Sequence, residues 1–396
     1  MSETFAGLAL LSLTIWVYLF CFRGQFWRTD QRLSARVLTP DPRPPSVCVV
    51  IPARNEAELL PVTLRSLLTQ DYPGVLNIFL VDDHSTDNTA EVARATAETL
   101  GKSEQLHILS AAPLPPGWTG KLWALDQGVQ KAMTLVEPDY ILLTDADIEH
   151  DRANLSQLVA KATEDDRELV SLMVRLRCQS VWEKLLIPAF VFFFEKLYPF
   201  RWVNEPRNAI AGAAGGCSLI RREALTRIGG VQAIRQALID DCALAEAIKS
   251  SGSKRIWLGL ADSTRSLRPY DSLETIWTMV ARTAFTQLNY SSLLLIGTIF
   301  GMSLIYLVPP VGILFGVFAG QWSIALPSLL AYLLMSLAYF PIVRFYRCPV
   351  WLAGCLPAIA FLYTLMTLDS ARRHWQRKGG AWKGRVYEAI KSEIKN

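Results

Sequence analysis

The chain has 396 residues, of which 51% are apolar and only 19% are charged, and its net charge is +4. Soluble domains are nearer a quarter charged, so part of the chain is expected to lie in lipid beside one large domain. The small net charge gives no argument for a nucleic-acid partner. The seven cysteines are scattered, without a Cys-x-x-Cys pair, which argues against a disulfide framework or a zinc site and is typical of a reducing compartment.

The first predicted element is an uncharged apolar run of nearly membrane-spanning length, residues 5–22. Four arginines follow it, beginning with Arg23, and no cleavage site is present, so residues 1–22 are expected to be an uncleaved anchor. The positive-inside rule then places the N-terminus outside and the chain after Arg23 in the cytoplasm. A buried core helix is the alternative.

A basic linker, residues 23–46, is expected next, and its second half is rich in proline. Short apolar runs then alternate with runs of helical spacing. The short runs predict buried parallel strands over residues 47–51, 78–81 and 140–143, and the others predict helices over residues 58–69 and 86–100. This order indicates βαβ units and a mostly parallel sheet, which binds ligands beyond the carboxyl ends of its strands.

Residues 182–200 are apolar and aromatic, yet they carry four charged residues and are interrupted by Pro188. A membrane span tolerates such charges poorly. An interfacial helix, with its aromatic rings among lipid headgroups, and a buried core helix are both consistent with this pattern.

Three further apolar runs predict membrane spans over residues 293–318, 324–343 and 350–368. Four spans in total would place the basic tail, which begins near Arg372, outside the membrane, against the positive-inside tendency. The pair Pro309-Pro310 is a candidate for a broken or re-entrant segment that would return the tail to the cytoplasm. The sequence leaves this topology open.

Polar motifs follow three of the predicted strands. Residues 52–56 read PARNE and residues 81–87 read VDDHSTD. A carboxylate at a strand end can accept hydrogen bonds from a ribose or a base. Helix capping explains Asp87 but leaves Asp82 and Asp83 as adjacent like charges without a reason.

The third motif is Thr144-Asp-Ala-Asp147, directly after the third predicted strand. Two carboxylates two residues apart can converge on one hard cation, and Mg²⁺ or Mn²⁺ bound in this way neutralises a diphosphate leaving group. Without a cation, the two acids would raise each other's pKa. His150, three residues later, is better explained as a hydrogen-bonded or exposed histidine than as a further metal ligand.

In this order the three motifs resemble those of the inverting family 2 glycosyltransferases, which have a GT-A fold. The resemblance runs from about Val47 to Arg282. It implies a nucleotide pocket lined by Pro52, Arg54, Glu56 and Asp83. It also implies that Asp145 and Asp147 hold the metal and the sugar diphosphate.

Two later features are similar to the same family. A stretch of small residues that contains Gly215 and Gly216 looks like the segment lining the sugar and acceptor site, where glycines let the backbone approach a ligand. Asp240-Asp241 looks like the family's Glu-Asp motif with Asp in place of Glu, so the resemblance implies that Asp241 is the general base for an acceptor hydroxyl. Capping of the following helix is the alternative.

Lys121, flanked by glycine, is a candidate contact for a phosphate or nucleotide, with a solvated surface lysine as the alternative. Related polysaccharide synthases carry a Gln-x-x-Arg-Trp motif after the base. The comparable stretch, residues 277–283, keeps Arg282 as a possible diphosphate contact but lacks the glutamine and tryptophan. This loss argues against a cellulose-like or chitin-like polymerase.

The stretches GWTGKLWAL, DADIEH, LLIPAFVFFFEKLYPF, AGAAGGCSLI and MVARTAFTQL closely resemble the hopene-associated glycosyltransferases of bacteria. This resemblance covers nearly the whole chain and implies a lipid acceptor related to hopanoids. The predicted organisation is the anchor and linker, a cytoplasmic GT-A domain over residues 47–290, about three spans over residues 291–370, and a basic tail over residues 371–396.

The expected protein is an integral protein of the bacterial inner membrane that transfers a sugar from a nucleotide sugar to a lipid. A UDP-sugar is the expected donor. Two alternatives stay open. One is a polyisoprenyl-phosphate sugar transferase, whose acceptor is a phosphate. The other is a catalytically inactive sensor or scaffold that binds sugar nucleotides, although a scaffold has no need of clustered, mutually repelling carboxylates.

Overall fold

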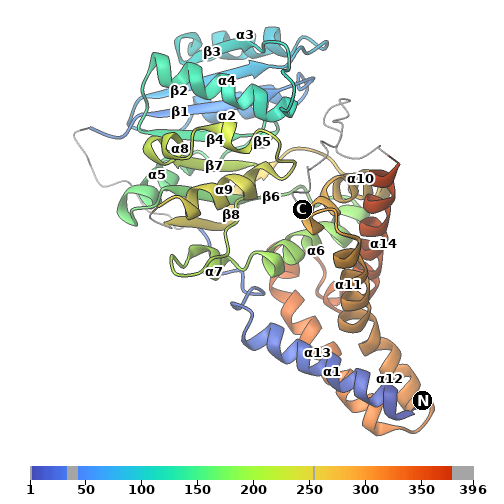
Figure 1. The fold of residues 1–396 in the computed structure, drawn as a ribbon. Helices are drawn as coiled ribbons and strands as arrows, with labels where there is room; N and C mark the ends of the chain where they lie inside the picture. The colour runs from blue at the N-terminus through green and yellow to red at the C-terminus, as the bar shows by residue number, and fades with distance from the viewer. Residues whose placement is uncertain (1, 34–42, 253–254, 377–396) are drawn as a thin grey trace, which may run out of the picture. The chain divides into compact units, whose positions relative to one another are not determined.

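The computed structural model describes residues 2–33, 43–252 and 255–376 (Figure 1). Most of the proline-rich part of the predicted linker and nearly all of the basic tail therefore lie outside the described residues. The chain divides into two compact units. The sheet unit holds the described parts of Gln31–Arg177 and Trp202–Pro269, and the helical unit holds Cys178–Arg201 with the described parts of Met1–Asp30 and Tyr270–Gly380.

One sheet of eight strands organises the described part of the sheet unit, in the order β3-β2-β1-β4-β7-β6-β8-β5. The strands are β1 (Val47–Ala53), β2 (Leu76–Asp82), β3 (Leu106–Ser110), β4 (Tyr140–Thr144), β5 (Ile148–Glu149), β6 (Leu169–Arg175), β7 (Cys217–Arg221) and β8 (Ile256–Ser266). β3, β2, β1 and β4 run parallel, and β8 is parallel to β6. β7 is antiparallel to both of its neighbours, and β5 is antiparallel to β8. The α/β sheet and its three predicted strands are confirmed, in a more mixed form than expected.

Helices cover both faces of this sheet (Figure 1). They are α2 (Leu60–Leu68), α3 (Thr89–Thr99), α4 (Gly120–Leu135), α5 (Asn154–Glu164), α8 (Arg222–Arg227) and α9 (Asp240–Ser250), and α7 (Phe200–Asn204) lies where the two units meet in sequence. Every residue of β1 is buried, as a two-sided parallel sheet requires. Gly128 lets α4 lie close to β1, because a Cβ there would stand 2.4 Å from Val50 Cγ1.

The loops after β1 and β2 interlock. Asp83 N donates to the Ala53 carbonyl at 2.8 Å, and Glu56 N donates to Thr89 Oγ1 at 3.0 Å. Asn55 has a left-handed backbone, and its side-chain Oδ1 accepts from the Thr86 N–H at 2.8 Å. These bonds fix the polar residues beyond the carboxyl ends of neighbouring parallel strands.

The helical unit consists of α1 (Ser2–Cys21), α6 (Val181–Leu197), α10 (Leu273–Thr283), α11 (Ser292–Met302), α12 (Val308–Phe318), α13 (Trp322–Phe345) and α14 (Leu356–Trp375). Among the described residues, four segments are long and apolar enough to cross a membrane. These are Ser2–Cys21, Ser292–Phe318, Trp322–Phe345 and Val350–Trp375. They correspond to the four apolar runs that were predicted from the sequence.

The break predicted at Pro309-Pro310 is wrong, because the chain stays helical from Ser292 to Phe318. α11 and α12 are joined by a π turn, Ser303–Leu307. Pro309 and Pro310 carry no N–H, so the Ile305 carbonyl has no helical donor. Trp16 on α1 supplies one, since its Nε1 donates to that carbonyl at 2.8 Å. The proline pair therefore creates a binding point for α1 instead of an interruption.

Helix α6 is the apolar, charged stretch whose setting the sequence left open. It begins with a capping box in which Glu183 N donates to Ser180 Oγ at 3.1 Å and Ser180 N donates to Glu183 Oε2 at 2.8 Å. Glu183 is therefore buried as part of a helix cap, where backbone N–H groups compensate its charge. Lys196 Nζ donates to Tyr306 Oη at 2.9 Å. Within the helical unit α6 is a packed helix, in contact with α10, α13 and α14.

Candidate active site

The first pair of site residues joins the ends of β1 and β2. Arg54 Nη1 donates to the Asp83 carbonyl at 2.6 Å and lies 3.4 Å from Asp83 Oδ2. Asp83 is buried, and Arg54 keeps a fifth of its side chain exposed. Asp82, at the end of β2, accepts from the Ser85 N–H at 3.2 Å. Pro52 is buried within β1, so it shapes this edge through the backbone.

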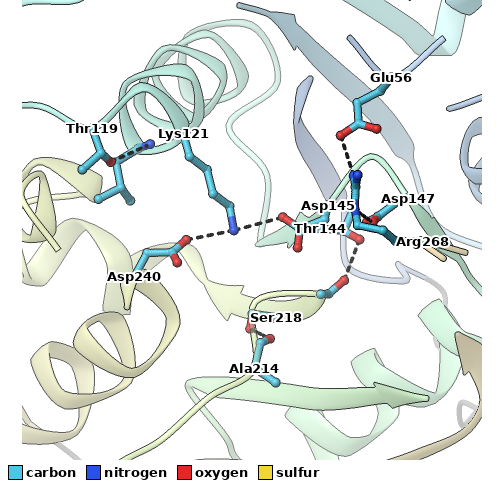
Figure 2. Close-up of polar contacts among 12 residues, drawn as sticks. Glu56, Thr119, Lys121, Thr144, Asp145, Asp147, Ala214, Ser218, Asp240 and Arg268 are labelled. Atoms are coloured by element: carbon cyan, nitrogen blue, oxygen red, sulfur yellow. Dashed lines mark hydrogen bonds and ion pairs between the residues drawn. The ribbon is translucent and has the colours of Figure 1, made fainter. Parts of the chain in front are cut away.

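A second ion-pair set joins the ends of β1 and β4 through an arginine that follows β8. Arg268 Nε lies 2.6 Å from Asp147 Oδ2, and its Nη2 lies 2.7 Å from Glu56 Oε1 (Figure 2). Both carboxylates are nearly buried, whereas about a third of the Arg268 side chain is exposed. One guanidinium thus compensates two buried acids and fixes their separation.

A third set is centred on Lys121, in the first turn of α4. Its ammonium lies 3.0 Å from Asp145 Oδ1 and 3.1 Å from Asp240 Oδ2, between the loop after β4 and the start of α9 (Figure 2). Burial alone would lower the pKa of Lys121, but the two carboxylates raise it above its usual range. Burial raises the pKa of Asp145, and Asp147 and Asp240 raise it further, against the opposing effect of Lys121.

Asp241 adjoins this set on α9. Its Oδ1 accepts from the Cys242 N–H at 2.7 Å. Burial, with the charge of Asp240, raises the pKa of Asp241 to about 6, although Lys121 opposes the shift. A carboxylate of this pKa is ionised at neutral pH and can still accept a proton. A pocket at this place is lined by Lys121, Leu122, Leu125, Leu143, Thr144, Asp145, Gly215, Ser218, Val231, Ile234, Asp240, Asp241 and Leu244.

Gly215 forms the floor of this pocket. A Cβ at this position would stand 3.5 Å from both Asp241 Oδ2 and Lys121 Nζ, in ordinary contact with each, so a longer side chain would enter the space beside them. At the next residue, Gly216, the carbonyl accepts from Thr144 Oγ1 at 2.7 Å. Gly215 thus brings backbone close to the acidic cluster, and at Gly216 a Cβ would stand 2.8 Å from Val174 Cγ2, too close for a side chain.

His150 is buried and has a structural role. Its Nε2 lies 3.0 Å from Thr144 Oγ1, and its Nδ1 lies 3.0 Å from Asn154 Nδ2. Because Thr144 donates to Gly216 and the Asn154 amide donates to Nδ1, the bonding network assigns the neutral tautomer with the proton on Nε2. Burial lowers the pKa of His150 to about 3, which agrees with that neutral state. The expected hydrogen-bonded histidine is confirmed.

The charged site residues of the sheet unit thus fall into three sets of ion pairs, which follow the ends of β1, β2 and β4. Asp145, Asp240, Asp241, Lys121 and Gly215 come together in one pocket. The remaining predicted residues of the sheet unit are held in the ion pairs and loop contacts beside it: Glu56 and Asp147 with Arg268, and Arg54 with Asp83. Gly216 and Pro52 shape the backbone.

One predicted residue lies outside the sheet unit, and one residue of the ion pairs was not predicted. Arg282 lies exposed on α10 in the helical unit, so its link to a diphosphate stays a prediction. Arg268 was missed by the sequence reading. Its one signal was a basic residue soon after the apolar strand IWLGLA, and such residues are common at strand ends.

The carboxylates of the loop after β4 suit a hard cation that is also bound by the oxygens of a diphosphate. Asp145 and Asp147 offer carboxylate oxygens, which Mg²⁺ and Mn²⁺ prefer. In the part of the chain that the structure describes, no group of three or more His, Cys, Asp or Glu side chains is arranged to hold a metal. Each of the two acids already has a cationic partner. A cation here would therefore need further oxygen ligands from a substrate or from water.

Comparison with known families agrees with this geometry. Residues 48–229, from β1 to just beyond α8, match the family described as Glycosyl transferase family 2. The match covers a little less than half of the chain, and it shows that this part is similar to family 2 glycosyl transferases. The match takes in the loops after β1, β2 and β4 and the glycine segment, and it ends before Asp240, Asp241 and Arg268.

Curated relatives of this domain are more distant. The chain is 26% identical over 249 residues to a probable glycosyltransferase, YdaM, of Bacillus subtilis, which covers 61% of this chain and 54% of that protein. It is 29% identical over 144 residues to an undecaprenyl-phosphate 4-deoxy-4-formamido-L-arabinose transferase of Yersinia enterocolitica, over 35% of this chain and 39% of that one. The chain thus spans about half or less of the length of these relatives.

Among solved structures, the chain is similar to the mannosyltransferase PcManGT from Pyrobaculum calidifontis, which was determined with GDP-Man and Mn²⁺. The TM-score is 0.55 and the identity 20%, and the match covers 93% of this chain and 99% of that one. At this identity the similarity establishes the fold. The sheet unit therefore has the GT-A architecture that the sequence predicted.

Proposed function

We propose that this chain is a membrane-bound inverting glycosyltransferase, which moves a sugar from a nucleotide diphosphate sugar to the hydroxyl of a lipid. The observation that carries the proposal is one pocket in which Asp145, Lys121, Asp240 and Asp241 surround the backbone of Gly215. This arrangement sets a candidate base beside the acidic loop after β4. The family 2 domain supports the same reading.

The donor is proposed to lie along the charged edge, by which we mean the ion-paired residues that follow β1, β2 and β4. Arg54, Asp82 and Asp83 would contact the nucleoside, and Glu56 would be held in place by Arg268. Asp145 and Asp147 would hold Mg²⁺ or Mn²⁺ together with the diphosphate. When bound, this cation neutralises charge on the departing diphosphate. Lys121 adds a second positive charge within the same pocket.

The transfer step needs one base. In the proposed step the acceptor oxygen forms a bond to the anomeric carbon, and the bond from that carbon to the diphosphate oxygen breaks. The nucleoside diphosphate leaves with the electron pair, and Asp241 takes the hydroxyl proton. The carboxylate of Asp241 is oriented by the Cys242 N–H. Attack from the face opposite the leaving group inverts the sugar configuration.

A lipid acceptor is proposed from two observations. Four apolar segments of the chain are candidate membrane spans. The chain also resembles the hopene-associated glycosyltransferases, so the finer proposal is a hopanoid-related acceptor and a UDP-sugar donor. The cytoplasmic domain over residues 47–290 would then work at the inner face of the bacterial inner membrane, with residues 1–22 and 291–370 as its membrane anchors.

A polyisoprenyl-phosphate acceptor is the second candidate. One relative is named for transfer to undecaprenyl phosphate. A phosphate acceptor is already ionised and needs little base catalysis, so the role of Asp241 separates the two candidates.

The test uses the full chain in nanodiscs with radiolabelled UDP-sugars and GDP-sugars, Mn²⁺ or Mg²⁺, and a bacterial lipid extract. The expected result is a labelled lipid from one donor, formed by the native protein but not by Asp241→Asn. Full activity of Asp241→Asn would favour the phosphate acceptor. Absence of both transfer and metal-dependent sugar-nucleotide hydrolysis would favour the scaffold and overturn the proposal.

A further inference from the structure

Val350–Trp375 is long and apolar enough to cross a membrane, but its contacts raise a different possibility. The contacts used below all lie within the helical unit, which has two opposite ends. Ser2 Oγ donates to Gln321 Oε1 at 2.8 Å, and α12 turns into α13 there. We name this the turn end. At the other end, the domain end, α13 finishes at Phe345 and α11 begins at Ser292.

The hairpin of α12 and α13 shows that these two ends are truly opposite. A Cβ on Gly316 would stand 2.6 Å from Ala325 N, and one on Gly312 would stand 2.1 Å from Ser328 Oγ. Successive contacts thus move backward on one helix as they move forward on the other. The two helices are antiparallel, and Ser292 and Phe345 lie far from the turn end.

The segment starts at the domain end. Cys348 N donates to the Val343 carbonyl, and Cys348 Sγ lies 3.6 Å from Cys178 Sγ, just before α6. The chain then runs beside α13 toward the turn end. The evidence is that the Gly354 carbonyl accepts from Tyr332 Oη at 2.7 Å. Tyr332 precedes the end of α13 by 13 residues, about 20 Å along a helix axis.

Helix α14 then returns to the end from which the segment came. Tyr363 Oη donates to the Leu186 carbonyl of α6 at 2.9 Å, and Trp277 Nε1 on α10 donates to Asp369 Oδ2 at 2.9 Å. The His374 ring stacks on Tyr290, two residues before α11, with 4.4 Å between centroids. Figure 1 shows α14 beside α10, away from the end marked N. Both ends of the segment thus lie at the domain end.

The turn of this segment, Val350–Cys355, has a backbone and side chains that can lie among acyl chains. Val350–Cys355 is a 3₁₀ helix set between Pro349 and Pro357, and its irregular backbone would be costly among acyl chains unless it were covered by protein. Leu352 and Ala353 are buried, and Tyr332 satisfies the Gly354 carbonyl. Val350 and Trp351 instead are 60% and 67% exposed, so they can contact lipid.

We infer that Val350–Trp375 is a re-entrant hairpin, which inserts among the acyl chains of one leaflet and returns, and that the chain crosses the membrane three times. The distribution of charge agrees. Arg23, Arg344 and Arg372 lie at the domain end, whereas the described residues of the turn end, residues 2–3 and 319–322, include no Lys or Arg. Three crossings keep the basic residues on one side, as the positive-inside rule prefers, whereas four would divide them.

The test is labelling of single introduced cysteines by a membrane-impermeant maleimide, in the full chain with Cys21→Ser. Ala319→Cys reports the turn end, Gln376→Cys the end of α14, and Ser103→Cys the sheet unit, and all three positions are exposed. Intact cells and permeabilised cells are compared, and labelling of the parent with its other native cysteines is subtracted.

Three crossings predict that Gln376→Cys and Ser103→Cys lose labelling in intact cells, whereas Ala319→Cys keeps it. Labelling of Gln376→Cys together with Ala319→Cys in intact cells, with Ser103→Cys protected, would establish four crossings and overturn the inference. If instead Gln376→Cys and Ser103→Cys label together while Ala319→Cys is protected, the hairpin holds and only the proposed cytoplasmic orientation fails.

A second measurement needs no substitution. Green fluorescent protein fused after Asn396 fluoresces when folded in the cytoplasm, whereas alkaline phosphatase at the same place is active only outside. Three crossings with an outer N-terminus predict a fluorescent fusion and an inactive phosphatase. An active phosphatase with a dark fluorescent fusion, together with a cytoplasmic Ser103, would contradict the hairpin.

Discussion

The two units of this chain place their polar side chains in different ways. In the sheet unit, acids and bases meet one another around a pocket, as in the contact of Lys121 with Asp145 and Asp240. In the helical unit, two polar side chains instead donate to backbone carbonyls that have no helical donor. Trp16 donates to Ile305, and Tyr332 donates to Gly354.

The difference reflects what each setting penalises. In an apolar bundle an unpaired backbone carbonyl is costly, so side-chain donors are used where proline or a turn has removed a helical one. At the carboxyl ends of the strands, charged side chains compensate one another and remain able to contact a ligand. The charges around Lys121 therefore line the candidate pocket, whereas Trp16 and Tyr332 satisfy the backbone of the bundle.

Replacing Asp147 is the strongest test of the ligand role of the charged edge. Asp147→Ala is expected to abolish turnover, because a cation would lose one of its two protein carboxylates, while the protein still folds. Activity in nanodiscs and thermal unfolding measure the two effects. Asp262→Ala is the matched control, since Asp262 is 51% exposed and pairs with Arg32. Near-normal activity of Asp147→Ala would remove the metal from the mechanism.

Asp241→Asn is expected to lower kcat by about 10²- to 10⁴-fold, the usual contribution of a general base. Binding of the sugar nucleotide should change little, because the amide keeps the shape of the acid. Isothermal titration of the donor and single-turnover kinetics distinguish the two effects. Loss of donor binding with unchanged chemistry would make Asp241 a binding residue and not the base.

The activity should depend on pH through the same carboxylate. Burial and Asp240 raise the pKa of Asp241 to about 6, and the base must be ionised to work. We expect kcat/KM to be constant above that pKa and to fall about tenfold per pH unit below it. A profile that stays flat down to pH 5 would contradict this role.

Arg268→Gln tests whether the ion pairs of the sheet unit compete with a cation. Arg268 occupies Asp147 Oδ2 at 2.6 Å and repels a positive ion, so its removal should tighten Mn²⁺ binding without nucleotide on the order of tenfold. Electron paramagnetic resonance of free Mn²⁺ measures the affinity. The matched control is Arg265→Gln, an exposed arginine 2.6 Å from Glu149. Weaker Mn²⁺ binding in Arg268→Gln would show that the arginine supports the ion.

The smallest effect is expected in the helical unit. Trp16→Phe leaves the Ile305 carbonyl without a donor and should destabilise the bundle by about 1 kcal/mol. The loss should shrink when Pro309→Ala restores an N–H at the position that normally bonds this carbonyl. Thermal unfolding of the four variants measures the coupling, and Trp322→Phe, at a tryptophan that is 71% exposed, is the control. Equal losses in both backgrounds would mean that the carbonyl has another partner.

Much of the sheet was predictable because its strands are local apolar runs. VCVVI and YILL became β1 and β4, and the polar motifs after them became the rim. The antiparallel β7 was not predictable, because strand direction depends on pairing between distant segments. The role of Arg268 was not predictable for the same reason, since its partners Glu56 and Asp147 lie more than a hundred residues away in the sequence.

By itself, the sequence determined which segments are apolar enough for lipid and which acids follow buried strands, because both depend on local composition and spacing. Only the tertiary structure decided that the Pro309 helix stays continuous while the chain turns back at Gly354, and which cation compensates each acid. These outcomes depend on donors such as Trp16, Tyr332 and Arg268, which folding alone brings to their partners.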